Sequence, residues 1–213
     1  MKYDAVLFDM DGTVMETAPG VINGFKYALN KLNVPFPDVP ERLFLGPPLD
    51  YSLREYVLLP EKLIPEAVRQ YRVYYNDIGI MECKVYEGVR ELLELLNARG
   101  VKCLVASSKP EPFVNRILRS FGLDGLFFFA AGSDINGKWG TKEEVIKRAL
   151  RLGEVKDASR CLMVGDRYYD INGAKALGID SCGILWGYGV REEFEESGAT
   201  YIVEKPKEIA DII

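Results

Sequence analysis

Short runs of apolar residues recur along the chain, and a turn or a helix-like segment follows each of them. The first is Ala5–Phe8, four apolar residues without a polar break, which is typical of a strand buried on both faces of a sheet. Segments of the same kind follow at residues 101–106, 126–130, 160–164, 181–185 and 200–203. The pattern therefore predicts six largely buried strands.

Helix-like segments lie between these runs, at residues 88–99, 111–121, 141–152 and 170–177. Gly100, Gly122 and Gly178 follow three of them, in the usual position of a glycine that ends a helix. The fourth begins with Thr141 and Glu144 in a capping-box arrangement. This alternation predicts an α/β fold, with a doubly wound, mostly parallel sheet and helices on both faces. In such sheets the active site lies at the carboxyl ends of the strands.

One region interrupts the alternation. Between Glu16 and Met81 no convincing strand is present, and helix-like segments at 18–32, 40–45, 51–58 and 61–77 are separated by Pro and Gly. We interpret residues 16–81 as an inserted four-helix cap subdomain, and residues 1–15 and 82–213 as the α/β core. The alternative is that these helices pack directly into the main core.

Composition and charge narrow the function classes. Of 213 residues, 48% are hydrophobic and 28% are charged, which fits a globular domain rather than a disordered chain. The net charge of -5 comes from interspersed acidic and basic residues, so we expect neither a nucleic acid polymer nor an anionic membrane as partner. The longest apolar stretch, 126–131, is too short to span a bilayer. A cytoplasmic location is the expectation.

The chain contains four cysteines and no histidine. The cysteines are widely spaced without a CxxC pair, which favours buried, reduced thiols over disulfides or a zinc site. The absence of histidine excludes Ser-His-Asp triads, HExxH zinc sites and imidazole bases. Any chemistry must therefore rest on carboxylates, Lys, Arg, hydroxyls and a metal, and nothing in the composition calls for an organic cofactor.

Asp9 and Asp11 directly follow the first apolar run. Two carboxylates at the end of a buried strand suit phosphoryl transfer, where one attacks phosphorus and the other supplies and removes protons. Gly12 would allow the turn, and Thr13 would tie its backbone. Taken alone, the same string could also be a solvated turn.

Asp166 and Asp170 follow another buried run in the same way. Together with Asp9 and the backbone carbonyl of Asp11, they would form an all-oxygen site suited to Mg²⁺. Asp170 alone could instead be the N-cap of its helix.

Ser107 and Ser108 end the run 101–106, so a hydroxyl and successive amides could hold phosphate oxygens there. The competing interpretation is simple helix capping before Pro110. Lys142 lies in the first turn of its helix, where it could neutralise a phosphate and the nucleophile, although a lysine in that position is usually a surface charge.

The order of these motifs resembles the haloacid dehalogenase superfamily over essentially the whole chain. Residues 8–13 match its first motif, Ser107 with Ser108 its second, Lys142 its third and residues 165–170 its fourth. The helical insert is similar to the cap of the phosphoglycolate phosphatase and β-phosphoglucomutase branch. Residues 45–49, 106–110 and 186–189 resemble bacterial phosphatases of the phosphoglycolate phosphatase-like or 5′-nucleotidase-like kind.

This resemblance implies a Mg²⁺-dependent phosphatase in which Asp9 is the nucleophile, Asp11 is the general acid and base, and an aspartyl-phosphate forms on Asp9. Asp11 argues against a dehalogenase. A phosphomutase is the first alternative, and a catalytically silent domain that binds Mg²⁺ and phosphate is the second.

The substrate is expected to be a small phosphorylated metabolite, such as phosphoglycolate or a nucleoside monophosphate. In capped members of the superfamily the insert reads the leaving group. Candidate contacts there are Phe44, Leu49, Arg54 and Arg72. The family contains both monomers and homodimers, so both oligomeric states remain open.

Overall fold

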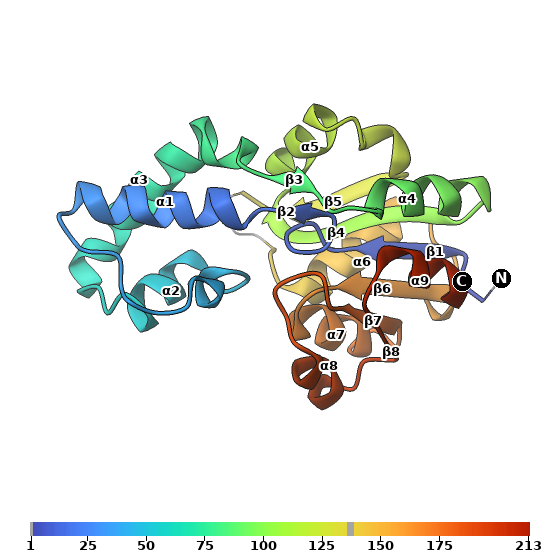
Figure 1. The fold of residues 1–213 in the computed structure, drawn as a ribbon. Coiled ribbons are helices and arrows are strands. Elements are labelled where there is room, and N and C mark those ends of the chain that lie inside the picture. Colours follow the sequence, from blue (N-terminus) through green and yellow to red (C-terminus); the bar gives the residue numbers. More distant parts are fainter. Residues whose placement is uncertain (1, 136–138) are drawn as a thin grey trace. The chain divides into compact units, whose positions relative to one another are not determined.

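Six parallel strands form the main sheet, in the order β5-β4-β1-β6-β7-β8 (Figure 1). This computed structural model describes residues 2–135 and 139–213. The strands are β1 (Ala5–Phe8), β4 (Lys102–Pro110), β5 (Phe129–Ser133), β6 (Cys161–Gly165), β7 (Asp180–Ile184) and β8 (Tyr201–Val203). All four residues of β1 are buried, because parallel neighbours flank the strand and helices cover both faces.

Helices cover the sheet on its two faces. Contacts between elements group α6 (Lys142–Leu152), α7 (Tyr168–Lys175) and α8 (Arg191–Ser197) on one face. The helices α4 (Val89–Ala98), α5 (Glu111–Ser120) and α9 (Pro206–Ile212) pack on the other. Apolar side chains from β1, β4 and β6 meet those of α6 in a shared core. The predicted doubly wound α/β fold is therefore confirmed.

Two strand predictions differ in their limits from the structure. The segment expected at 126–130 begins instead at Phe129, because residues Asp124–Leu126 form a short 3-10 helix, η4. The strand expected to end at residue 106 continues to Pro110, with a register shift between Ala106 and Pro110 in its pairing with β5. The second motif thus lies within an irregular strand end rather than in the loop that follows.

The contacts divide the chain into two units, Met1–Met15 with Val85–Ile213 and Glu16–Lys84. A separate two-stranded sheet pairs β2 (Met15–Glu16) with β3 (Lys84–Val85), where the chain passes from one unit to the other and back. The second unit extends three residues beyond the expected end at residue 81.

Within this insert, all four predicted helical segments are found, but only three of them are α-helices. The α-helices are α1 (Ala18–Lys31), α2 (Leu49–Glu55) and α3 (Ile64–Asp77). Residues Glu41–Phe44 form a 3-10 turn, η1, where a helix was expected. Two further 3-10 turns are η2 (Glu61–Leu63) and η3 (Gly79–Met81). The third segment starts at Leu49 because Pro48 precedes it as the N-cap. It cannot extend to Leu58, whose φ of +55° lies outside the right-handed helical region.

The four cysteines are free thiols, and Cys103, Cys161 and Cys182 are buried, in agreement with the sequence. Burial raises the pKa of the Cys103 thiol to about 12, so it is protonated and inert at neutral pH. Among the described residues no helix is both long and apolar enough to cross a membrane.

Candidate active site

The carboxyl ends of two adjacent strands, β1 and β6, bring the predicted acidic residues together. Phe8, the last residue of β1, is in register with Val105 of β4 and Val164 of β6. Asp9 follows directly, and its backbone N–H donates to the Val164 carbonyl at 2.9 Å. Because β1 and β6 are neighbours, Asp9 lies beside the loop that begins with Asp166, as the parallel sheet required.

Three carboxylates meet at this edge. Asp9, Asp166 and Asp170 each offer an oxygen within 4.8 Å of the others, and Asp166 and Asp170 are each only 1% exposed. Burial, together with the neighbouring acids, raises the pKa of Asp9 to about 6 and that of Asp166 well above its ordinary value. The backbone N–H of Tyr188 donates to Asp166 at 2.9 Å and opposes the shift of Asp166.

Lys142 is the cation within this cluster. Its Nζ lies 2.9 Å from Asp9 Oδ1, 2.8 Å from Asp170 Oδ1 and 3.0 Å from the Ala106 carbonyl oxygen, so three acceptors match the three N–H donors of the ammonium group. Burial acts to lower the pKa of Lys142, but the attraction of Asp170 and Asp9 outweighs it and the pKa is raised. The lysine is therefore a buried, charged group and not a surface charge.

Local sequence fixes the position of this lysine. Lys142 is the first residue of α6, and the predicted capping box is confirmed there: the Glu144 N–H donates to Thr141 Oγ1, and the Thr141 N–H donates to Glu144 Oε2. These bonds satisfy donors that the first turn would otherwise leave free. The helix start is thus fixed where Lys142 must enter the core.

The charge balance and the donor chemistry fit a divalent cation. The cluster holds three carboxylates and one ammonium group, which contacts two of them, and its formal charge is -2 when all are ionised. Hard carboxylate oxygens in this number are the ligands that Mg²⁺ takes in proteins. Burial is the largest cause of the raised pKa values of Asp9 and Asp166, and repulsion from the neighbouring acids adds to it, so a bound cation would oppose that repulsion.

Asp11 lies outside this group of three side chains. Its Oδ2 is 3.0 Å from Lys109 Nζ, and its Oδ1 is buried without a hydrogen-bond partner among the described residues. The turn after Asp11 is held by the Gly12 N–H, which donates to the Met15 carbonyl at 2.8 Å. The expected tie through Thr13 is made differently, because Trp186 Nε1 donates to the Thr13 carbonyl at 3.1 Å while the hydroxyl has no partner in the described chain.

The second motif gives one buried and one exposed serine. Ser107 is 1% exposed, and its Oγ accepts the backbone N–H of Lys109 at 3.2 Å. Ser108 is exposed. Neither serine caps α5, since the N-cap is Pro110 without a side-chain bond, so the helix-capping alternative is wrong.

Comparisons with known proteins identify the family. Residues 6–184 match the profile described as haloacid dehalogenase-like hydrolase. The chain belongs to this family. A 5′-nucleotidase from Pseudomonas aeruginosa is 35% identical over 202 residues, which cover 94% of this chain and 91% of that protein. The tyrosine-protein kinase PtkA of Mycobacterium tuberculosis is 38% identical over 201 residues, covering 93% of this chain and 67% of the kinase.

A solved structure supports the same relationship. A Clostridium difficile protein assigned as a phosphatase has a TM-score of 0.90 and 45% identity, covering 99% of this chain and 98% of that one. The chain is an enzyme, a phosphatase-type hydrolase of the haloacid dehalogenase-like family, and the predicted resemblance is confirmed.

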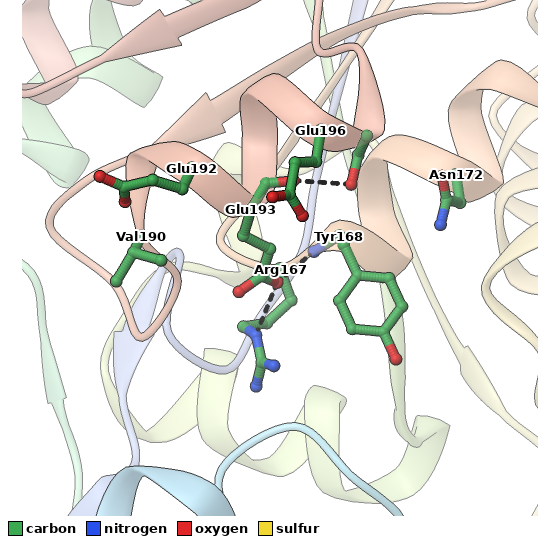
Figure 2. Close-up of a pocket in the computed structure, with 8 residues that line it drawn as sticks. Arg167, Tyr168, Asn172, Val190, Glu192, Glu193 and Glu196 are labelled. Carbon is green, nitrogen blue, oxygen red and sulfur yellow. Dashed lines mark hydrogen bonds and ion pairs between the residues drawn. The ribbon is translucent and has the colours of Figure 1, made fainter.

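In this hydrolase the fourth motif is held by Glu193, which the sequence did not predict as a site residue. Glu193 of α8 accepts a bond from the backbone N–H of Tyr168 at 2.6 Å and from Arg167 Nε at 2.9 Å (Figure 2). Asp170 is the third residue of α7, and its Oδ2 accepts the backbone N–H of Arg167 at 3.1 Å. The N-cap of this helix is thus Arg167 and not Asp170, which leaves the other oxygen of Asp170 for Lys142.

Glu193 and its two partners, Arg167 and Tyr168, line the pocket shown in Figure 2, whereas none of the three clustered aspartates does. Its lining consists of Arg167, Tyr168, Asn172, Val190, Glu192, Glu193, Glu196 and Ser197. Three glutamates and one arginine are among the lining residues, a formal charge of -2 that disfavours a phosphate ester. None of the residues predicted to react with or bind phosphate lines it.

The candidate contacts in the insert have different environments. Phe44 is 1% exposed, and its ring packs against Phe25, Phe36 and Tyr56 of the same unit, so it belongs to the interior of the insert. Arg54 Nε pairs with Glu61 Oε1 at 2.5 Å. Arg72 is exposed on α3, and Leu49, the first residue of α2, is half-buried. Because its side chain is buried, Phe44 is a packing residue of the insert.

Gly12 offers a local test of the site. Its φ is +79°, and an added Cβ would lie 2.0 Å from Asp166 Oδ2. Gly100 has a similar φ of +77°, but a Cβ there would meet nothing within 4 Å. Both Gly→Ala variants should lose about 1–2 kcal/mol of stability through the left-handed backbone. Only Gly12→Ala should also displace Asp166 and lower kcat, by about 10²-fold.

Thermal melting and steady-state phosphate release, measured on both variants, check this expectation. Equal kcat values for the two would contradict the tight packing of the turn against Asp166.

Proposed function

We propose that this hydrolase is a Mg²⁺-dependent phosphatase that hydrolyses a small phosphate monoester through an aspartyl-phosphate on Asp9. The observation that carries the proposal is the grouping of Asp9, Asp166 and Asp170 around Lys142, with Asp11 on the same turn as Asp9. This arrangement provides a nucleophile, a separate acid and base, and a site for a cation.

In the proposed reaction, the Asp9 carboxylate attacks phosphorus while the bond from phosphorus to the ester oxygen breaks, and Asp11 gives a proton to the departing alkoxide. Water then attacks the same phosphorus, Asp11 takes a proton from that water, and the bond between phosphorus and Asp9 breaks. The products are an alcohol and inorganic phosphate. Asp9 and Asp11 return to their starting protonation states.

The remaining groups bind and orient. Asp9, Asp166 and Asp170 would hold Mg²⁺, with the backbone carbonyl of Asp11 as a fourth oxygen. When bound, Mg²⁺ supplies positive charge that offsets the charge of the phosphate oxygens. Lys142, 2.9 Å from Asp9 Oδ1, holds the nucleophile in place and adds a second positive charge.

Ser107 and Ser108 would receive the phosphoryl oxygens. The buried Ser107 hydroxyl lies at the end of β4, next to the strand that carries Asp9, in the segment where the pairing of β4 with β5 shifts register. Backbone N–H groups and a hydroxyl are suitable partners for a phosphate.

The substrate class is a small phosphorylated metabolite, either phosphoglycolate or a nucleoside monophosphate. The similarity to a 5′-nucleotidase over nearly the full length of both proteins supports the second. The insert would read the leaving group through exposed or half-buried residues such as Leu49, Arg54 and Arg72.

A panel of phosphate monoesters, assayed with and without Mg²⁺, tests this proposal. Inorganic phosphate release that requires Mg²⁺ is the expected result. Isomerised sugar phosphate without net phosphate release would instead establish the phosphomutase alternative. Inactivity on every ester, p-nitrophenyl phosphate included, would mean a silent Mg²⁺- and phosphate-binding domain.

Metal binding should also appear in the pH dependence of stability. The pKa of Asp9 is about 6 in the folded, metal-free protein, above its ordinary value near 4, and burial also raises the pKa of Asp166 well above its ordinary value. The folded state therefore holds these protons more tightly than the unfolded chain. The resulting stabilisation is complete below about pH 4 and is lost as pH rises through about 6 and beyond.

We therefore expect metal-free protein to melt at a lower temperature at about pH 7.5 than at about pH 5.5. Mg²⁺ at about 100 times its Kd should add about 2.7 kcal/mol at the higher pH. That corresponds to a rise in Tm of roughly 5–10 °C for a chain of this size. The same ionic strength of KCl is the control, and an equal rise with KCl would contradict a specific site.

A further inference from the structure

Lys109 is a second buried lysine near the site, separate from Lys142. Its Nζ lies 3.0 Å from Asp11 Oδ2, and its side chain is only 6% exposed, whereas that of Asp11 is 31% exposed. A buried ammonium group is costly unless paired, so the contact with Asp11 is a strong constraint on both side chains. Lys142 contacts Asp9 and Asp170, so each lysine serves a different carboxylate of the first motif.

The backbone holds Lys109 in place from two directions. Its N–H donates to Ser107 Oγ at 3.2 Å, within the segment where β4 departs from regular pairing with β5. On the β5 side, Gly132 allows close approach, because a Cβ there would lie 2.6 Å from the Lys109 carbonyl oxygen. A side chain on so constrained a backbone delivers its ammonium group to a defined point.

The two oxygens of Asp11 differ in environment. Oδ2 is paired with Lys109, while Oδ1 is buried and has no hydrogen-bond partner among the described residues. A carboxylate that is fixed through one oxygen and enclosed around the other is held in a single orientation. Proton transfer requires such an orientation, because the donor and acceptor atoms must come within hydrogen-bond reach.

We propose that Lys109 is the positioning residue for Asp11, holding Oδ2 so that the carboxyl group keeps the one orientation in which it exchanges the proton with the leaving group and then with water. This inference rests on the proposed function, in which Asp11 is the general acid and base. It assigns Lys109 a role in proton transfer and not in attack on phosphorus.

If Lys109 positions Asp11, the effect of replacing Lys109 should depend on the leaving group of the substrate. An alkoxide must be protonated as it departs, whereas p-nitrophenolate is stable without a proton. Loss of Asp11 positioning should therefore slow formation of the phosphoenzyme much more from an alkyl phosphate than from p-nitrophenyl phosphate. General acid catalysis typically contributes 10²–10⁴-fold, so a mispositioned acid should lose about 10–10²-fold more on the alkyl ester.

The rate at which the phosphoenzyme is hydrolysed gives a second, independent test of this role. Hydrolysis of the phosphoenzyme needs Asp11 as a base whatever the leaving group was. With p-nitrophenyl phosphate, the Lys109→Met variant should form the phosphoenzyme at nearly the wild-type rate and hydrolyse it slowly. A burst of p-nitrophenolate, with phosphoenzyme accumulating on Asp9, is the expected result.

Rapid-quench kinetics on wild type, Lys109→Met and Lys109→Arg would test the proposal, with p-nitrophenyl phosphate and an alkyl phosphate compared for each. Lys109→Arg keeps the charge and should recover part of the lost rate. The matched control is Lys102→Met, on the same strand, where the lysine bonds to the Gly153 carbonyl at 3.0 Å and takes no part in the site. It should show no dependence on the leaving group.

Equal losses on both esters without a burst, or unchanged rates in Lys109→Met, would overturn the role of Lys109. If Lys109→Met does not fold, Lys109→Gln and Lys109→Arg are compared by the same ratio of rates between the two esters, and an unchanged ratio in both refutes it. Failure of the proposed function is recognised separately, by a wild-type enzyme that turns over without forming any phosphoenzyme.

Discussion

Asp9→Asn should lower kcat by at least about 10⁴-fold while leaving the protein folded. An amide cannot take the place of the carboxylate as nucleophile, and replacing the nucleophile of an enzyme that forms a covalent intermediate costs up to about 10⁶-fold. The variant keeps the shape of the side chain and removes one of three crowded acids, whose burial raises the pKa of Asp9 to about 6. Its Tm should therefore equal or exceed that of the wild type at neutral pH.

Steady-state phosphate release and the mass of acid-quenched enzyme measure the two parts of this expectation. The wild type should carry a phosphoryl adduct during turnover, and Asp9→Asn should carry none. Asp124→Asn is the matched control, since Asp124 is an exposed acid at the start of η4 in the same unit. Substantial activity or an adduct in Asp9→Asn would remove Asp9 from the proposed role.

The core of the site could be predicted because it depends on the ends of buried strands. Ala5–Phe8 has no polar residue, so it had to be central, and acids that directly follow such strands had to share one edge. Asp9 and Asp166 are grouped for this reason, and the first turn of α7 adds Asp170. The start of α6 could be predicted as well, because a capping box is a local pattern.

The contacts of Lys109 and Glu193 could not be predicted from the sequence, because they depend on tertiary packing between segments that are distant along the chain. The pairing of Lys109 with Asp11 follows from the register shift within β4. The bond from the Tyr168 N–H to Glu193 joins the start of α7 to α8, 25 residues later in the chain. The sequence offered one usable signal, the lysine next to Ser107 and Ser108, whereas a glutamate on an amphipathic surface helix offers none. In the insert, prolines shortened the helices, and burial of Phe44 followed from aromatic neighbours distant along the chain.

Lys142→Met should be strongly destabilising and should also reduce activity. The ammonium group is buried and contacts Asp9 Oδ1, Asp170 Oδ1 and the Ala106 carbonyl oxygen, so its removal leaves two carboxylates without their cation. Breaking a buried ion pair in this way costs about 3–5 kcal/mol, or a fall in Tm on the order of 10 °C for a chain of this size. The fall in Tm should be smaller at about pH 5. The pKa of Asp9 is raised even with Lys142 present, so Asp9 becomes protonated at that pH and no longer carries an unpaired negative charge.

Lys147→Met is the matched control for this loss, because it removes a lysine from the same helix at an exposed position. Lys147 pairs with Glu143 at 2.5 Å on the surface, and such a pair contributes little to stability. Melting curves of both variants at two pH values, with and without Mg²⁺, distinguish the contribution of the Lys142 charge to stability from that of its apolar stem. Mg²⁺ should restore part of the stability of Lys142→Met, since a cation held by Asp9 and Asp170 replaces the missing positive charge. Equal melting of the two variants, or a loss that does not change with pH, would mean that Lys142 acts through its apolar stem and not through its charge.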